Sequence, residues 1–149
     1  MKEIRRYVIG NWKSQKRFED VQRWLDDFAQ LYVPRQGLQV VIAPTFLCLD
    51  ATARYLESLR LENVSLAAQD VSPFPRGSYS GAIAADLLKG MAEFAIVGHS
   101  ERRRYFHETS QDVGNKVIET VDAGIIPIVC DDQPYAMSQL TALNDVDTD

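Results

Sequence analysis

The sequence has few cysteines, no long apolar run and no excess of positive charge. Cys48 and Cys130 lie far apart and form no CxxC pattern, which favours reduced thiols over a disulfide or a metal-binding pair. No window approaches the roughly 18 apolar residues of a membrane span, and the N-terminus lacks the apolar stretch of a secretory signal. We therefore expect a cytoplasmic chain with no membrane contact.

The overall charge argues against a nucleic-acid partner. The formal net charge is −5, so no general attraction to phosphate backbones is expected. Arginines 102–104 stand together, but no aromatic stacking platform accompanies them. We interpret them as a helix face paired with Glu101, Glu108 and Asp112.

The totals are those of one ordinary globular domain, which we expect to span residues 1–149. The length of 149 residues, a hydrophobic share of 46% and a charged share of 25% are all typical of such a domain. No stretch rich in glycine, serine and proline interrupts the chain as a linker. A core of useful size can therefore form.

Short apolar runs alternate with helical patterns along the chain. The runs are 7–11, 40–44, 64–68, 94–99 and 125–130, and each is apolar at successive positions, as in a strand buried on both faces. Helical spacing appears at 18–31, 50–60, 83–91 and 109–124, with a further short helix near 134–143. This alternation predicts an α/β fold with a parallel sheet and helices outside it.

The carboxyl ends of the predicted strands deliver the candidate site. Ligands gather at this end of such sheets, and the strand ends carry Asn11, Lys13 and His99. Lys13 offers a fixed positive charge and Asn11 a neutral donor. His99 precedes a helix, whose dipole disfavours the charged imidazole, so a neutral ring could donate a hydrogen bond to a carbonyl oxygen.

Three motifs resemble those of a known family. GNWK at 10–13, AAQD at 67–70 and especially VGHSERR at 97–103 are similar to the signatures of triosephosphate isomerases, and the resemblance runs from about residue 5 to residue 130. It implies a (β/α)8 TIM-barrel type of fold, of which only about five βα units are present in this chain.

The resemblance also implies a reaction and roles for the site residues. The reaction is the interconversion of glyceraldehyde 3-phosphate and dihydroxyacetone phosphate through an enediol, in glycolysis and gluconeogenesis, without cofactor or metal. His99 and Lys13 would be catalytic, and Asn11 and Lys13 would bind the substrate. Ser100 and Glu101 would support them, Glu101 by orienting Lys13, although a plain helix-start carboxylate is an open alternative for Glu101.

The resemblance further implies a homodimer formed through the loop 72–81. The family's proton-abstracting glutamate belongs to strands six to eight, so the 149-residue chain alone should isomerise poorly or not at all. We expect the sequence to be the front part of a longer product or one half of a split barrel, with a truncated gene as the third possibility. The alternative is a non-catalytic half barrel that binds a partner chain through its open sheet edges.

Overall fold

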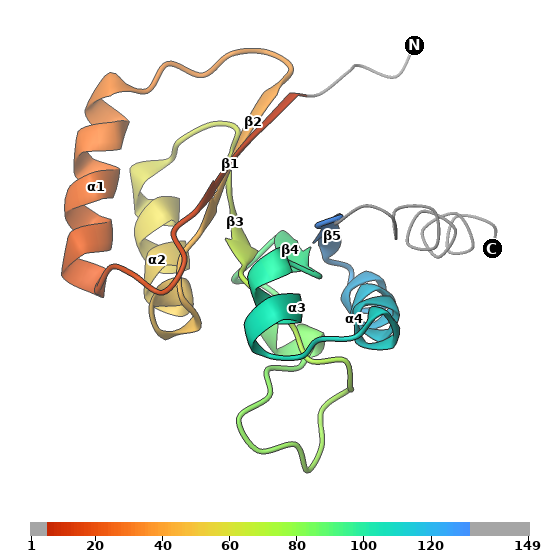
Figure 1. Ribbon diagram of the computed structural model, residues 1–149. Coiled ribbons are helices and arrows are strands. Elements are labelled where there is room, and N and C mark those ends of the chain that lie inside the picture. The colour runs from red at the N-terminus through yellow and green to blue at the C-terminus, as the bar shows by residue number, and fades with distance from the viewer. Residues whose placement is uncertain (1–5, 132–149) are drawn as a thin grey trace. The chain divides into compact units, whose positions relative to one another are not determined.

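The computed structural model describes residues 6–131 of the chain, which fall into two compact units (Figure 1). The first unit holds residues 6–69 and 90–94, and the second holds residues 70–89 and 95–131. The elements in chain order are β1 (Arg6–Asn11), α1 (Phe18–Leu31), β2 (Leu38–Ala43), α2 (Phe46–Leu59), β3 (Val64–Ala68), the 3-10 helix η1 (Ala85–Leu88), β4 (Phe94–Val97), α3 (Ser100–Tyr105), α4 (Ser110–Asp122) and β5 (Ile126–Val129).

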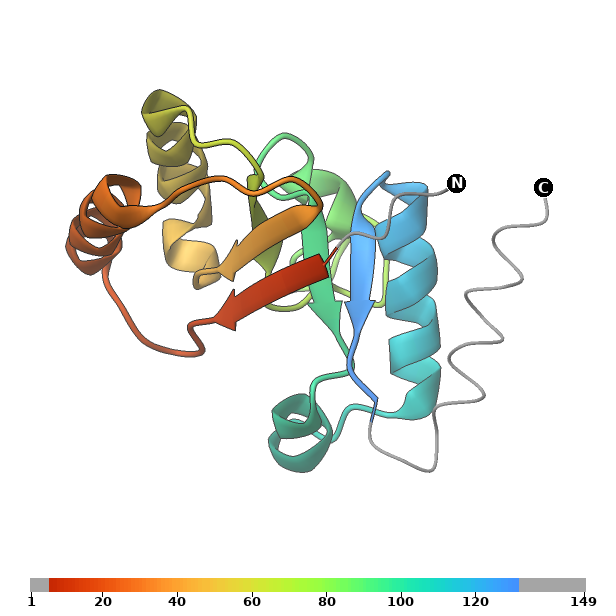
Figure 2. The ribbon, with the colours of Figure 1, turned by 90° about the horizontal axis from the view of Figure 1, so that it is seen from above.

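In the first unit, three parallel strands lie in chain order beside two helices. β1 pairs with β2 and β2 with β3 in parallel register, for example Val8 with Val40 and Val40 with Val64. Figure 2 shows α1 and α2 on the same side of β1 and β2. Val21 and Leu25 on α1 are fully buried, because their spacing of four places both on one helix face.

In the second unit, β4 and β5 are neighbouring strands, and α4 runs alongside β5 (Figure 2). The Cys130 amide donates to the Val97 carbonyl over 2.8 Å, which ties the chain after β5 to the end of β4. Parallel strands alternating with helices are the arrangement of a partial (β/α) barrel of about five strands. The predicted fold class is therefore confirmed.

Two helical predictions differ from the structure. The pattern at 83–91 predicted a full helix, but only the 3-10 turn η1 forms there, because Gly90 takes a left-handed φ of 81° two residues after its end. On α4, the helical spacing at 109–124 predicts a buried stripe of Val113, Val117, Ile118 and Val121, yet Ile118 is 49% exposed while Lys116 is buried. The buried face of α4 therefore includes Lys116 and excludes Ile118.

The loop 72–81 extends away from η1 and α4 in the second unit (Figure 1). The rings of Phe74 and Tyr79 stack with centroids 4.6 Å apart, and each residue is 43% exposed. A pre-stacked, exposed aromatic pair is suited to meeting another surface. The predicted helix near 134–143 lies outside the described residues. Within residues 6–131, no helix has the length and apolar character to cross a membrane.

Candidate functional site

The backbone at the end of β1 places Lys13 in an unusual conformation. Lys13 has a φ of 58°, in the left-handed region that ordinary residues avoid. Its amide donates to Asn11 Oδ1 over 3.0 Å, so Asn11 holds the turn that carries the lysine. The structure therefore brings together the two residues predicted to bind substrate.

Gln69, at the end of β3, fastens the same turn from the other side. Its Nε2 atom donates to the Lys13 carbonyl over 2.9 Å and to the Ala43 carbonyl at the end of β2 over 2.8 Å. The Trp12 amide also donates to the Ala43 carbonyl, over 3.1 Å. Three strand ends thus share one hydrogen-bonded network, and Gln69 is its centre.

A left-handed conformation at a residue other than glycine costs of order 1–3 kcal/mol and persists only where the surroundings impose it. The hydrogen bonds from Asn11 and Gln69 supply that constraint. Such strain often marks residues whose position matters for function. It fits a lysine whose ammonium must be aimed from a rigid platform.

In the second unit, Gly98 turns the chain from β4 into the segment that carries His99. Gly98 has a φ of 72°, and a Cβ atom there would lie 3.0 Å from Arg103 Nη2 and 3.1 Å from a Val113 methyl group. Arg103 Nε donates to the Gly98 carbonyl over 2.8 Å. Only glycine fits this turn without displacing its neighbours.

His99 is the N-cap residue of α3, as the sequence predicted when it placed this histidine before a helix. Its Nδ1 atom accepts a hydrogen bond from the Glu101 amide over 3.1 Å, so Nδ1 carries no proton in this arrangement. The proton of a neutral ring therefore lies on Nε2, where it can be donated. This is the form of His99 that the predicted chemistry requires.

The structure places the two predicted supporting residues in the first turn of α3. Ser100 is exposed and begins the helix, and Glu101 follows it. The Glu101 carboxylate lies 3.5 Å from His99 Nδ1. Asn11 and Lys13 belong to the first unit, and His99, Ser100 and Glu101 to the second. Orientation of Lys13 by Glu101 stays a prediction.

A partly buried cluster of four charged side chains joins Arg102 of α3 and Lys116 of α4 to two carboxylates. Lys116 Nζ is 2.7 Å from Asp70 Oδ1 and 2.5 Å from Glu108 Oε2. Arg102 Nε is 2.9 Å from Asp70 Oδ2 and 3.0 Å from Glu108 Oε2. Each cation therefore contacts both carboxylates, and two positive charges balance two negative ones. The cluster therefore ties Asp70 to α3 and α4 within the second unit.

Sequence reasoning missed Gln69 and Lys116. The motif that contains Gln69 was noted, but no local pattern shows that an amide reaches two carbonyl groups distant in sequence. Lys116 gave a usable signal, because it is spaced from Val113 and Thr120 like a member of the buried stripe. A lysine at such a position needs carboxylate partners. Of the predicted arginine pairings, the one between Arg102 and Glu108 is confirmed.

The Asp70 carboxyl should make stability depend on pH. Burial raises the pKa of Asp70 above its ordinary 3.8, and the repulsion from Glu108 adds to this, while Lys116 and Arg102 lower it only in part. The folded chain therefore binds a proton more readily than the unfolded chain. Between 3.8 and the raised value, the stabilising contribution of Asp70 must fall as pH rises.

We expect Asp70→Asn to remove that dependence. The difference in unfolding free energy between wild type and variant should decline with rising pH, by at most about 1.4 kcal/mol per pH unit, and then become constant. Urea titrations from pH 3 to 7 measure it. Asp86→Asn is the control, because Lys89 lowers the pKa of exposed Asp86 and reverses the trend. A difference that rises with pH for Asp70→Asn would contradict the assignment.

Within residues 6–131, no group of three or more histidine, cysteine or acidic side chains is arranged to hold a metal ion. In the first unit the predicted site residues offer an ammonium and an amide, and in the second unit they offer an imidazole. Each of these groups is of a kind that can stabilise an oxygen atom that gains negative charge.

Comparison with known proteins points to one family. The family described as triosephosphate isomerase matches residues 6–146. The triosephosphate isomerase of Mesomycoplasma hyorhinis is 36% identical over an alignment of 129 positions, which covers 83% of this chain and 51% of that protein. The one of Clostridium beijerinckii is 33% identical over 83% of the chain and 48% of its own length. The chain thus spans about half the length of the curated relatives it matches.

Proposed function

From the premise that this chain belongs to the triosephosphate isomerase family, we propose that it contributes half of a site that interconverts glyceraldehyde 3-phosphate and dihydroxyacetone phosphate. The observation that carries the proposal is Lys13, held in a strained left-handed turn by Asn11 and Gln69. The strained backbone at Lys13 costs stability, so its retention in a well-anchored turn is better explained by recognition of an anion.

In the proposed mechanism, the protein stabilises the negative charge that develops on the substrate oxygen. Proton abstraction next to the carbonyl converts the substrate into an enediolate. Lys13 offsets its charge, and Asn11 holds the turn that aims the ammonium. His99 donates its Nε2 proton to the carbonyl oxygen and passes protons between the two oxygens. Preorganised groups of this kind usually make the largest contribution to catalysis.

Ser100 and Glu101 take the supporting roles in the proposal. The Glu101 amide donates to His99 Nδ1, which keeps that nitrogen as the acceptor and Nε2 as the donor. Glu101 would also orient Lys13, and Ser100 would contact the base when the site is empty. These roles rest on the family resemblance together with the positions of both residues at the start of α3.

We place the proton-abstracting glutamate outside these 149 residues, in the half of the relatives' length that this chain does not span. A positioned base supplies about 10² to 10⁴ in rate. The chain alone should therefore bind the substrate's charge pattern but turn over little of it. We further propose a cytoplasmic homodimer in which Phe74 and Tyr79 of the loop 72–81 meet the neighbouring copy.

The probe for this proposal is 2-phosphoglycolate, because its carboxylate and phosphate match the charges of the enediolate. We expect saturable binding to the 149-residue chain, at least tenfold weaker binding to Lys13→Ala, and no comparable loss for Lys16→Ala in the same loop. Isothermal titration calorimetry measures all three. Equal loss in both variants would show a general charge effect and contradict the site.

A coupled isomerase assay tests the absence of the base. We expect the rate of the purified chain to equal the rate of its His99→Gln variant. Turnover that disappears in His99→Gln would contradict the placement of the base outside the chain.

A second candidate is a non-catalytic half barrel that binds a partner chain. It is favoured by β1, where Tyr7, Val8 and Ile9 are 48%, 55% and 42% exposed, unusually open for consecutive apolar residues of a strand. Size-exclusion chromatography combined with the assay separates the candidates. An inactive, stable complex with a foreign protein favours the partner-binding function, whereas binding of 2-phosphoglycolate favours the catalytic site.

A further inference from the structure

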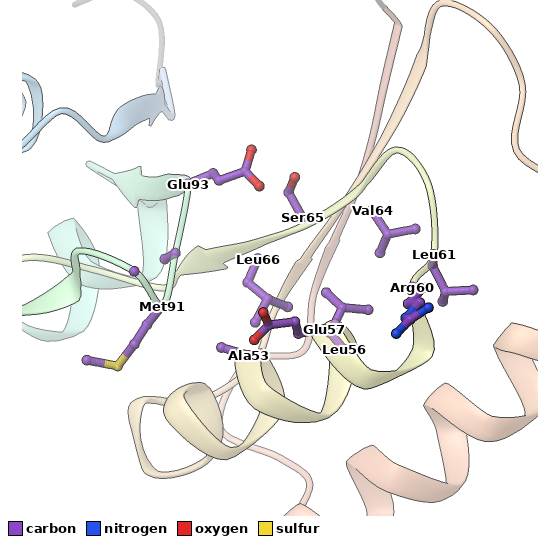
Figure 3. A pocket seen from close by; sticks show the side chains of 12 residues that line it. Ala53, Leu56, Glu57, Arg60, Leu61, Val64, Ser65, Leu66, Met91 and Glu93 are labelled. Carbon is purple, nitrogen blue, oxygen red and sulfur yellow. The ribbon is translucent and has the colours of Figure 1, made fainter.

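A hollow of about 400 Å³ in the first unit is lined by the start of β3, the end of α2 and the segment 90–93 (Figure 3). Its two carboxylates, those of Glu57 and Glu93, lie on opposite sides of β3 in that view, so they do not converge on one ligand. In the second unit, by contrast, polar groups converge on the side chain of Arg103, one turn of α3 after His99.

The three consecutive arginines of α3 point in different directions, because successive residues of a helix are about 100° apart. Arg102 reaches the carboxylates of the charged cluster. Arg104 is exposed, and its guanidinium lies 5.3 Å from the centre of the Tyr105 ring. Arg103 is half-buried and pairs with no carboxylate within residues 6–131, so its guanidinium is used in another way.

The Arg103 guanidinium donates to backbone carbonyl groups at the ends of β4 and β5. Its Nε atom donates to the Gly98 carbonyl over 2.8 Å, and Nη2 makes a longer contact of 3.5 Å with the Cys130 carbonyl. The Cys130 amide donates in turn to the Val97 carbonyl over 2.8 Å. Charged donors form the stronger hydrogen bonds. The bond to Gly98 is therefore the main one that holds this turn of the chain.

Arg103 also holds the carbonyl group of His99 itself. Its amide donates to the His99 carbonyl over 3.2 Å, and the Arg102 amide donates to the same oxygen over 2.9 Å. The carbonyl groups of Gly98 and His99 thus both accept from Arg103, so one residue fixes the peptide groups on both sides of His99. Figure 2 shows α3 beyond the ends of β4 and β5, where these bonds attach the helix to the strands.

The position of this first helical turn determines which nitrogen of the His99 ring carries the proton. The Glu101 amide donates to Nδ1 over 3.1 Å, whereas the Glu101 carboxylate lies 3.5 Å from the same nitrogen and could instead accept a proton from it. The amide can donate only while the start of α3 is held in place beside the ring. If the turn loosens, the carboxylate favours transfer of the proton from Nε2 to Nδ1.

We propose that Arg103 is a positioning residue that keeps the proton of His99 on Nε2. It does so by holding the first turn of α3 against the ends of β4 and β5, without touching the substrate. The inference rests on the proposed function, because the ring acts there as a hydrogen-bond donor through Nε2.

The hydrogen bond of Arg103 is tested first in the unaltered chain. In an isotope-labelled sample, the Nε proton of Arg103 should exchange with water at least tenfold more slowly than the Nε proton of exposed Arg104. This measurement needs no variant and so does not depend on whether a variant folds. Equal exchange rates for the two protons would overturn the proposal.

Arg103→Met then removes the donors and keeps the length of the side chain. At pH 8, the nitrogen signals of the His99 ring should show a share of Nδ1-protonated rings at least fivefold above that of the unaltered chain. The matched control Arg104→Met should leave these signals unchanged, and dispersed α4 amide signals verify the fold of each variant. A folded Arg103→Met variant that keeps the proton on Nε2, or an equal shift in Arg104→Met, would overturn the proposal.

The ring measurement uses no substrate analogue, so it is separate from the test of the proposed function. If 2-phosphoglycolate fails to bind the unaltered chain, the proposed function is wrong, and the His99 signals still decide the role of Arg103. We expect Arg103→Met to bind 2-phosphoglycolate at least fivefold more weakly. Unchanged affinity in a variant whose ring proton has moved would contradict the donor role of His99 in the proposed function.

Discussion

Replacing Lys116 by methionine should lower the free energy of unfolding of the second unit by about 3–5 kcal/mol. The substitution keeps the side chain's length and its packing but removes the ammonium. Asp70 and Glu108 are then left with Arg102 alone, and Glu108 Oε1 already has no hydrogen-bond partner within the described residues. Two poorly compensated carboxylates remain where Glu108 is 3% exposed, which is what makes the loss large.

Lys89→Met is the matched control for this prediction. Lys89 Nζ lies 2.6 Å from Asp86 Oδ1, but both side chains are well exposed, so the pair should contribute no more than about 1 kcal/mol. The chain's two tryptophans, Trp12 and Trp24, lie in the first unit, so their fluorescence reports on that unit. Unfolding of the second unit in urea is therefore best followed through the NMR signals of the α4 amides. Similar losses in both variants would contradict a buried, interdependent cluster.

Replacing Gly98 by alanine should cost about 2–4 kcal/mol and shift the signals of the His99 ring. Two effects add: the left-handed backbone becomes strained, and the new methyl group overlaps Arg103 and Val113. The strain at the end of β4 is transmitted to the next residue, His99. Urea denaturation and the ring signals of His99 measure the two consequences separately.

Gly124→Ala isolates the contribution of the overlap. Gly124 has a φ of 74°, close to that of Gly98, but no atom lies within 4 Å of the position its Cβ would take. Gly124→Ala should lower the free energy of unfolding only through the backbone strain. The difference between the losses of the two variants therefore gives the steric contribution at Gly98. A loss for Gly124→Ala as large as that for Gly98→Ala would show that neighbouring atoms do not confine Gly98.

The sequence was most informative where local patterns determine structure. The strands were predicted from continuous apolar runs and α4 from the helical spacing at 109–124. Thr109 Oγ1 caps that helix by accepting a hydrogen bond from the Asp112 amide. These are interactions between residues a few positions apart. The prediction of a helix at 83–91 was wrong. The apolar residues have helical spacing, but Gly90 adopts a left-handed φ, which an α-helix cannot contain.

The site was predictable only in part, for the same reason. Asn11, Lys13 and His99 stand at strand ends, which the order of elements reveals. Gln69 acts through carbonyl groups of residues far away in the chain, and the partners of Lys116 come from two different loops. Contacts of this kind depend on the fold, so they cannot be predicted from the spacing of residues in the sequence.

We propose that Lys13 and His99 act on one bound anion, with the His99 proton on Nε2. A titration of the labelled chain with 2-phosphoglycolate, observed at the imidazole nitrogens of His99 and at the Lys13 amide, tests it directly. We expect both sets of signals to shift with one common dissociation constant while His99 keeps its proton on Nε2. Shifts at only one residue, or constants that differ more than tenfold, would contradict it.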